Sequence, residues 1–444
     1  MKETLANSAG ALSLPAFIQS AVASSDPRAR HAVPQLGRFV LLFVQLVVLV
    51  WIVRAFRVEE RAFLTMMGVA TGGFFVHYWL PFPLKEPFWI ALSMGGAALM
   101  LGTGPFLVLL FAGLVFFALL ASGLSYRTKV IGMATLAVLL MVGRGFEIEA
   151  IPAAAWPVLG ALFMFRMVVY LYDLRTAKRR PSLQEYLAYF YPLPNFYFLL
   201  FPVIDLQTQR RTYYQRDIHA MAQQGLLWMA RGVVQLLLYR LVYFLKPSFT
   251  PEEVTSFGTL VIAMAGTYLL YLRVSGQFHI IIGLMHLFGY DLPETHRKYL
   301  LASSITDFWR RINIYWKDFM VKVIYFPVYF RYRKGGDTRA KIIATVAVFV
   351  VTWALHSYQW FWLRGELLLS WTDTLFWVIL GILVIANLLL EQRATSKGAS
   401  PSGEGALLNG LKVAGTFSLI VVLWSFWQTP TIEEWTTTVA WWNR

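Results

Sequence analysis

One histidine stands out because it lies in a stretch that otherwise carries no charge. Residues 342–363 run for 22 positions without a formal charge, and they include His356 in the motif WALHSYQWFW. An ionisable residue inside such an apolar segment is costly and indicates a functional site. A neutral imidazole in a dry, enclosed place is suited to removing a proton from a hydroxyl group. The alternative is a histidine that only hydrogen-bonds a neighbouring helix.

A second polar residue, Asn313, lies within an amphipathic pattern over residues 299–331. The apolar stripe of a helical wheel consists of Ile305, Phe308, Ile312, Tyr315, Phe319 and Val323. Charged residues such as Arg310 and Arg311 lie off this stripe, which predicts one amphipathic helix in or beside a membrane rather than across it. Asn313 lies at the shoulder of the stripe, next to Trp309, so it either faces an interface or points into a polar site.

Other chemistry is less favoured. His77, His279 and His286 also lie in apolar segments, but each is better explained as a packing histidine with one satisfied nitrogen. The seven histidines show no metal-ligand spacing with carboxylates, so we expect no metal site. The chain has no cysteine, which excludes an acyl-cysteine intermediate. We find neither a phosphate-binding loop nor a dinucleotide fingerprint.

The composition is that of an all-α polytopic membrane protein. Hydrophobic residues make up 58% of the 444 residues and charged residues 14%, against roughly 25% charged residues in soluble proteins. A membrane-crossing helix needs about 20 largely apolar residues, and several candidates here nearly adjoin, so we expect nine to eleven spans. The candidates are 38–56, 62–83, 87–103, 104–123, 129–145, 150–171, 222–245, 254–274, 342–363, 372–390 and 413–429. Residues 276–289 are apolar but short and glycine-bearing, and they predict a re-entrant or tilted piece.

The charge distribution predicts sidedness. Segments 172–217 and 290–341 contain 7 and 11 of the 39 Lys and Arg residues, and the positive-inside rule makes them cytoplasmic. The net charge of +15 therefore indicates loops facing anionic lipid rather than nucleic acid. Arg54, Arg57 and Arg61 conflict with simple alternation: either the first helices are divided differently, or these arginines snorkel.

Five regions are expected along the chain. Residues 1–35 predict a flexible cytoplasmic tail, and 36–171 the N-terminal membrane helices. Residues 172–391 would form a core that carries the chemistry, and the Gly/Ser-rich segment 392–410 a flexible linker. Residues 411–444 would form a last helix and tail.

Several motifs together resemble those of the membrane-bound O-acyltransferases, and most closely the bacterial branch that acetylates exopolysaccharides or D-alanylates teichoic acid. The motifs are Gly276–Tyr290 (GQFHIIIGLMHLFGY), Leu292–Glu294 (LPE), Ser304–Arg311 (SITDFWRR), Leu355–Trp360 (LHSYQW) and Phe196–Pro202 (FYFLLFP). The likeness covers roughly residues 165–375. Two positions depart from the branch: Ile312-Asn313 stands where it has Trp-His, and Ser357 follows His356 where glycine is usual.

The resemblance implies a fold, a reaction and site residues. The fold would be a ring of helices around a central tunnel, with re-entrant and amphipathic helices. His356 would be the general base and Asn313 an orienting residue in acyl transfer to a hydroxyl, with Trp309, Arg310, Arg311 and Trp360 contacting substrate. The donor would be an acyl-CoA, most simply acetyl-CoA, with no bound cofactor. Alternatively, Arg310, Arg311 and Lys317 only contact lipid headgroups.

The resemblance also implies a cellular setting. The acceptor would be a polysaccharide or another component of the cell envelope, and an extracytoplasmic partner transferase would work with the chain in the bacterial inner membrane. An acceptor that is a lipid or a protein stays open, because asparagine at position 313 resembles the branches that acylate those. Two other functions also stay open: a transporter or flippase that catalyses no reaction, and a catalytically silent scaffold. A transporter predicts acids deep within spans, whereas only Arg166, Arg231 and Arg240 appear well inside a candidate span here.

Overall fold

The computed structural model describes residues 26–160, 165–176, 179–199, 203–367, 369–396 and 405–443. Over these residues the chain is helical, and an isolated β-bridge pairs Tyr213 with Tyr290. Three sequence predictions fall partly outside the described residues: the tail at 1–25, the linker at 397–404, and the FYFLLFP motif at 200–202. The all-α class is confirmed.

The helices follow one another in a single series. The first half contains η1 (Pro27–Ala32), α2 (Leu36–Ala55), α3 (Arg61–Trp79), α4 (Phe82–Leu101), α5 (Thr103–Ala121), α6 (Tyr126–Gly145), α7 (Ala155–Pro157), α8 (Phe165–Leu174), α9 (Leu183–Phe190), η3 (Leu193–Phe196) and α10 (Leu206–Thr212). The second half contains α11 (Ile218–Leu245), α12 (Phe257–Leu269), α13 (Leu272–Leu287), η4 (Tyr299–Leu301), α14 (Ile305–Arg311), α15 (Ile314–Met320), the π-helix η5 (Val321–Tyr325), α16 (Phe326–Tyr332), η6 (Arg333–Gly335), α17 (Asp337–Arg364), α18 (Trp371–Ser396), α19 (Ala406–Gln428), α20 (Ile432–Val439) and η7 (Trp441–Asn443).

Nine helices of the described chain are long and apolar enough to cross a membrane. This number agrees with the nine to eleven expected. Predicted spans 62–83 and 87–103 form α3 and α4, which are not among the nine. These helices carry polar groups at their junction: Lys85 is buried, and its Nζ donates to the backbone oxygens of His77 (2.6 Å) and Tyr78 (3.0 Å).

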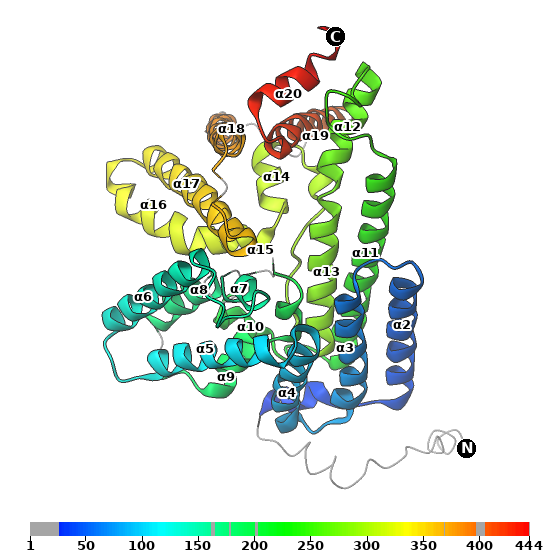
Figure 1. Ribbon diagram of the computed structural model, residues 1–444, viewed down its shortest axis with the longest axis vertical. Coiled ribbons are helices and arrows are strands. Elements are labelled where there is room, and N and C mark those ends of the chain that lie inside the picture. The colour runs from blue at the N-terminus through cyan, green and yellow to red at the C-terminus, as the bar shows by residue number, and fades with distance from the viewer. Residues whose placement is uncertain are drawn as a thin grey trace, which may run out of the picture.

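The helices are grouped by packing (Figure 1). Helices α2, α3, α11 and α13 run side by side on the right of the view, α5 and α6 lie at the lower left, and α16 and α17 at the upper left. Helices α18 to α20 lie at the top, and the short helices α10, α14 and α15 lie between these groups. The elements from the middle of the chain therefore occupy the interior, where the candidate site lies.

Residues 276–289, predicted to be a re-entrant or tilted piece, largely belong to α13 and do not form a re-entrant turn. Residues Phe257–Leu287 form one apolar stretch of 31 residues, in which α13 continues α12 after a short break. Helix α13 is buried along nearly all of its length because it packs closely against α11. Glycines allow this approach: a Cβ at Gly283 would lie 2.5 Å from the carbonyl oxygen of Gly225, and one at Gly232 would lie 2.5 Å from that of Gly276. Small residues of this kind commonly bring membrane helices together.

Replacing Gly283 with alanine should destabilise the protein. The added methyl group would lie 2.4 Å from Met229 Cγ and 2.5 Å from the Gly225 oxygen, so the two helices must separate. We expect a loss of about 1–3 kcal/mol in the free energy of unfolding, measured by thermal unfolding in detergent. The control is Gly415→Ala in α19, where a Cβ meets nothing within 4 Å. Equal unfolding temperatures for the two variants would contradict this packing.

The prediction of a single amphipathic helix over residues 299–331 is wrong. The segment breaks into α14, α15, η5 and α16, and Asn313 lies at the first break with a left-handed backbone (φ 39°). The loop at 289–298 holds this break open, because Ile314 N donates to Thr295 O and Arg297 N to Arg311 O. Asparagine tolerates the left-handed conformation better than most residues. The predicted stripe, from Ile305 to Phe319, is buried against the protein rather than turned to a membrane.

Helix α2 runs parallel to α11, and this relation bears on sidedness. Gln45 in the middle of α2 hydrogen-bonds Gln223 in the first third of α11 (3.0–3.2 Å). Arg240, near the end of α11, donates to the carbonyl oxygens of Phe56 and Arg57, just after α2. The end of α2, with Arg54 and Arg57, therefore lies beside the end of α11.

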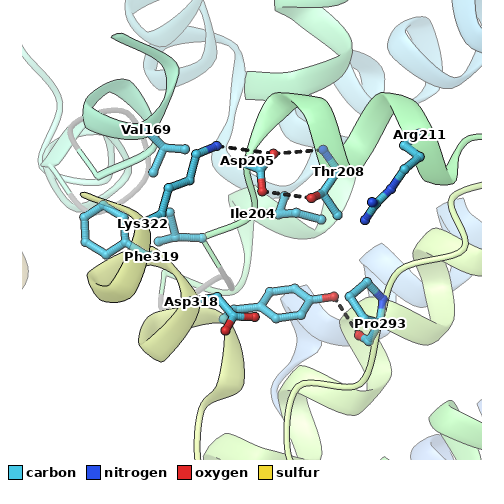
Figure 2. Close-up of a pocket in the computed structure, with 11 residues that line it drawn as sticks. Val169, Ile204, Asp205, Thr208, Arg211, Pro293, Asp318, Phe319 and Lys322 are labelled. Atoms are coloured by element: carbon cyan, nitrogen blue, oxygen red, sulfur yellow. Dashed lines mark hydrogen bonds and ion pairs between the residues drawn. The ribbon is translucent and has the colours of Figure 1, made fainter. Parts of the chain in front are cut away.

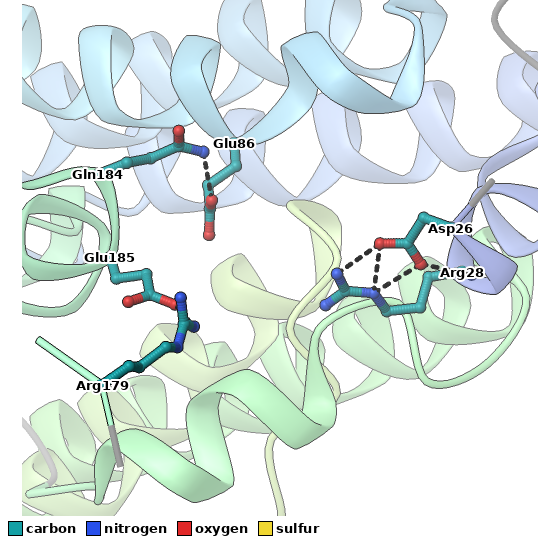
Figure 3. Close-up of polar contacts among 6 residues, drawn as sticks. All are labelled: Asp26, Arg28, Glu86, Arg179, Gln184 and Glu185. Atoms are coloured by element: carbon teal, nitrogen blue, oxygen red, sulfur yellow. Dashed lines mark hydrogen bonds and ion pairs between the residues drawn. The ribbon is translucent and has the colours of Figure 1, made fainter. Parts of the chain in front are cut away.

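Polar contacts tie the segment at 172–217 to the first helices (Figure 3). Gln184 of α9 donates to Glu86 of α4 at 2.6 Å, and Glu185 pairs with both Arg179 and Arg210. Part of the positive charge of this segment is therefore neutralised by its own carboxylate.

Candidate active site

His356 lies in the middle of α17, and its ring is fixed in one orientation. Nδ1 lies 2.9 Å from the backbone oxygen of Thr352, one turn earlier. Because a carbonyl oxygen only accepts, Nδ1 carries the proton of the neutral ring, and Nε2 keeps its lone pair. Nε2 has no hydrogen-bond partner in the described part of the chain, and the residue is half-buried. The free nitrogen is therefore the basic one.

Three indoles surround this imidazole. The ring centroids of Trp377 in α18, Trp316 in α15 and Trp427 in α19 lie 4.7, 5.6 and 6.3 Å from that of His356. Three elements distant in the sequence thus form an aromatic enclosure, defined here by Trp316, Trp377 and Trp427. Such an enclosure shields part of the imidazole from water and lowers the local dielectric constant.

Asn313 adjoins this enclosure through Trp316. Its Oδ1 accepts from Trp316 N at 3.3 Å, so the side chain is the N-cap of α15. Nδ2 of the same amide has no partner among the described residues. Trp316 contacts both residues: its backbone N binds Asn313, and its indole ring lies against His356. Sequence patterning placed Asn313 within a helix and did not reveal its capping role.

The other predicted site residues contact partners other than the His356 ring. Trp309 packs on Phe349 of α17 with 4.9 Å between ring centroids, and Trp360 lies one turn beyond His356 with the Arg364 guanidinium 4.2 Å above its ring. The cations expected at a donor entrance are paired: Arg310 with Glu391 (3.4 Å), Arg311 with Asp307 (2.7 Å), and Lys317 with Asp318 (2.8 Å). Their charge is therefore largely compensated.

A cavity of about 230 Å³ lies next to α15 (Figure 2). It is lined by Val169, Val203, Ile204, Asp205, Thr208, Arg211, Pro293, Tyr315, Asp318, Phe319 and Lys322. Neither Asn313 nor His356 lines the cavity. Phe319, which does line it, is connected to His356 through the ring of Trp316. Phe319 lies 5.4 Å from Trp316, and Trp316 lies 5.6 Å from His356, centroid to centroid.

The charges around this cavity are unevenly paired. Lys322 is held by Asp173 (2.5 Å) and Asp205 (3.6 Å), and Asp205 also accepts from Thr208 N and Oγ1. Arg211, one helical turn after Thr208, has no ion pair in the part of the chain that the structure describes. In Figure 2 its guanidinium extends toward the cavity. Sequence patterning did not single out Arg211, because the cavity lining comes from α8, residues 203–205, α10, the 289–298 loop, α15 and η5.

The loop at 289–298 is anchored to both sides of the site. Tyr315 of α15 donates its hydroxyl to Pro293 O (2.6 Å), and Asp291 receives Arg216 (2.5 and 2.6 Å) and His286 Nε2 (3.2 Å). Burial alone would raise the pKa of the Asp291 carboxyl, but the hydrogen bonds from His286 and Arg216 hold that pKa well below its usual range. This carboxylate therefore stays ionised and fixes the loop.

The three other histidines considered as site candidates are buried within the helix bundle. His286 also contacts Ile282 O through Nδ1 (2.7 Å), and His279 contacts Gln235 Oε1 (2.7 Å) while stacking on Trp228. His77 packs between Phe88 and Phe288. Within the described residues, no group of three His, Asp or Glu side chains could hold a metal ion.

Asp373 is a site residue that the sequence did not reveal. It lies in the first turn of α18, and its Oδ1 accepts from Trp427 Nε1 (2.6 Å) and Trp377 Nε1 (3.3 Å). Asp373 lies at the start of predicted span 372–390, so its position is that of an ordinary residue at a helix end. The sequence analysis expected no acid well inside a span. The two tryptophans that it binds belong to the enclosure around His356.

Comparison with known proteins gives no assignment for this arrangement. No family model matches the sequence, and no curated protein matches it.

Proposed function

We propose that the protein is a membrane-bound O-acyltransferase that moves an acyl group, most simply acetyl, from acetyl-CoA to a hydroxyl of a cell-envelope acceptor such as a polysaccharide. The observation that carries the proposal is His356 Nε2, a free basic nitrogen inside the Trp316–Trp377–Trp427 enclosure. Two motifs of the resemblance, Ser304–Arg311 and Leu355–Trp360, lie before Trp316 and around His356 in the sequence. In this proposal the interior between the helix groups is the tunnel of that fold.

The reaction needs no group beyond the two substrates and the chain. His356 Nε2 takes the proton of the acceptor hydroxyl, and the oxygen attacks the thioester carbonyl carbon. The tetrahedral intermediate collapses, the carbon–sulfur bond breaks, and the leaving thiolate takes the proton from the imidazolium. General-base assistance of this kind contributes about 10²–10⁴-fold to the rate.

Asn313 would act through its side-chain NH₂ group. Oδ1 is engaged by the cap on Trp316 N, whereas Nδ2 is unpartnered in the described structure. A fixed N–H donor can stabilise the negative charge that develops on the thioester oxygen. This role refines the expectation of an orienting residue, because the cap holds the amide in one orientation.

The anionic part of the donor would meet the 230 Å³ cavity rather than the three paired cations. Arg310, Arg311 and Lys317 each face a carboxylate, whereas Arg211 lines the cavity without one. A guanidinium without a carboxylate partner is suited to a phosphate oxygen. The donor would then approach from the side of segments 172–217 and 290–341, which the positive-inside rule makes cytoplasmic.

Replacing Arg211 with glutamine should raise the KM for acetyl-CoA roughly tenfold and leave kcat unchanged, because one charge-assisted contact is lost. The measurement is the initial rate of acetyl transfer against acetyl-CoA concentration. The control, Arg339→Gln, removes an exposed arginine outside the cavity. An equal change of KM in both variants would point to general surface charge instead.

The test of the proposed function uses labelled acetyl-CoA and membranes from cells that express the chain. We expect label to enter an acceptor fraction of the envelope in step with CoA release, and only with the intact His356. The chain has no cysteine, so a thiol reagent applied to purified protein reports CoA alone. Absence of both transfer and CoA release in native bacterial membranes would refute the proposal. Loss of transfer on purification would indicate the partner transferase.

A transporter without chemistry is the second candidate, and one cluster favours it. Glu59 is almost fully buried, and it accepts from Arg273 (3.1 Å), Gln277 (3.0 Å) and Tyr197 (3.2 Å). Shielded carboxylates that pair with an arginine occur along transport pathways. Glu59→Gln would then abolish transport while leaving CoA release unchanged, whereas an acyltransferase keeps its His356-dependent reaction.

A further inference from the structure

The carboxylate of Asp373 is held in an unusual way. One oxygen, Oδ1, accepts from two indole N–H groups, those of Trp427 (2.6 Å) and Trp377 (3.3 Å). The other oxygen, Oδ2, is buried and has no hydrogen-bond partner among the described residues. The backbone N of Asp373 donates to Ser370 Oγ at 3.0 Å, which fixes the first turn of α18. The carboxylate is thus immobile and only half satisfied.

The same two indoles lie against the imidazole of His356. The Trp377 ring is the nearest of the enclosure at 4.7 Å, and Trp427 stacks on Phe376 at 4.7 Å and an interplanar angle of 11°. Within the described chain, α15, α18 and α19 each present an indole to the histidine, and α18 also contributes Asp373, which binds two of these indoles. The carboxylate is therefore placed behind the aromatic wall of the base.

A buried carboxylate oxygen without a partner is costly unless a positive charge forms nearby. His356, on the other side of the indoles that Asp373 binds, becomes positive once Nε2 has taken a proton. Interactions that strengthen when charge develops accelerate a reaction more than those already present in the ground state.

We infer that Asp373 is a positioning residue for His356: its carboxylate fixes the two indoles that enclose the imidazole, and its charge stabilises the transient imidazolium. The inference rests on the proposed acyl transfer and adds a third residue to it. It differs from a direct aspartate–histidine pair, because Nδ1 is taken by Thr352 O and the carboxylate acts across the indoles.

A purely structural role makes a different prediction. An acid in the first turn also stabilises a helix through the helix dipole, and Oδ1 would serve only as an acceptor for the indoles. Asparagine keeps an amide oxygen for both indoles and removes the charge. Glutamate keeps the charge, and alanine removes both features. The asparagine variant therefore separates the two roles.

The experiment measures kcat, KM for acetyl-CoA and unfolding temperature for the full chain in native membranes and in detergent. For Asp373→Asn we expect kcat to fall roughly 10- to 100-fold with KM unchanged, and the unfolding temperature to stay close to that of the unmodified protein. Asp373→Glu should retain at least about a tenth of kcat. Glu433→Gln, an exposed acid of α20, is the control for loss of a negative charge.

The outcomes separate this inference from the function on which it rests. If the unmodified chain shows no transfer that depends on His356, the proposed function fails. If transfer depends on His356 but Asp373→Asn has the kcat of the unmodified chain, the inference alone is overturned. If Asp373→Asn unfolds early, Asp373→Glu decides: a fully folded glutamate variant with kcat as low as that of Asp373→Ala overturns the inference.

Discussion

Replacing His356 with glutamine should lower the rate of acetyl transfer by about 10²–10⁴-fold, the contribution of a general base. Glutamine can still donate to Thr352 O and fill most of the space inside the enclosure, but it offers no nitrogen of comparable basicity. We therefore expect kcat to fall with little change in the KM for acetyl-CoA or in the unfolding temperature. The measurement is initial-rate acetyl transfer in membranes that contain equal amounts of each variant.

Two further variants make this result specific. His356→Ala removes the whole imidazole and should be as inactive as His356→Gln, with a lower unfolding temperature because it leaves a cavity among three indoles. His31→Gln changes a histidine of η1, outside the site, and should leave the rate unchanged. Transfer that survives in His356→Ala would mean that another group takes the proton, and the assignment of the base would be wrong.

The membrane character of the chain was predictable because it depends on local hydropathy alone. Nine of the expected apolar segments form helices long enough to span a bilayer. Breaks within an apolar pattern were not predictable, because they depend on partners distant in the sequence. The break at Asn313 is held by backbone bonds from the 289–298 loop, and α13 continues α12 because glycines let it pack on α11.

The candidate site was predictable where a single residue contradicted its surroundings. His356 stands out in an uncharged segment, whereas Asp373 reads as an ordinary helix-start acid until α19 places Trp427 beside it. Tryptophans in a membrane chain are expected mainly in interfacial belts and packing, so the enclosure by Trp316, Trp377 and Trp427 has no signature in the sequence. Tertiary contacts among α15, α17, α18 and α19 assign these residues to one place.

The second large effect concerns Asn313. Replacing it with aspartate should lower the transfer rate by about 10²–10³-fold, the cost of removing one oxyanion donor, while the protein stays folded. Aspartate accepts from Trp316 N as well as asparagine does, and both residues tolerate the left-handed backbone at φ 39°. Only the N–H₂ group is lost, and a negative charge replaces it where the thioester oxygen would develop its own.

A residue that served solely as the cap of α15 would give the opposite result, since Asn313→Asp would then match the unmodified chain in rate and in unfolding temperature. Asp217→Asn is the matched control: it makes the reverse exchange at the N-cap of α11, where Oδ1 accepts from His219 N (3.0 Å) and Ala220 N (3.3 Å). Asn313→Gly completes the set, because it keeps the left-handed backbone and loses both halves of the amide. If the glycine variant is inactive and the aspartate variant active, the cap matters and the N–H₂ donor does not; if both are inactive and folded, the donor is required.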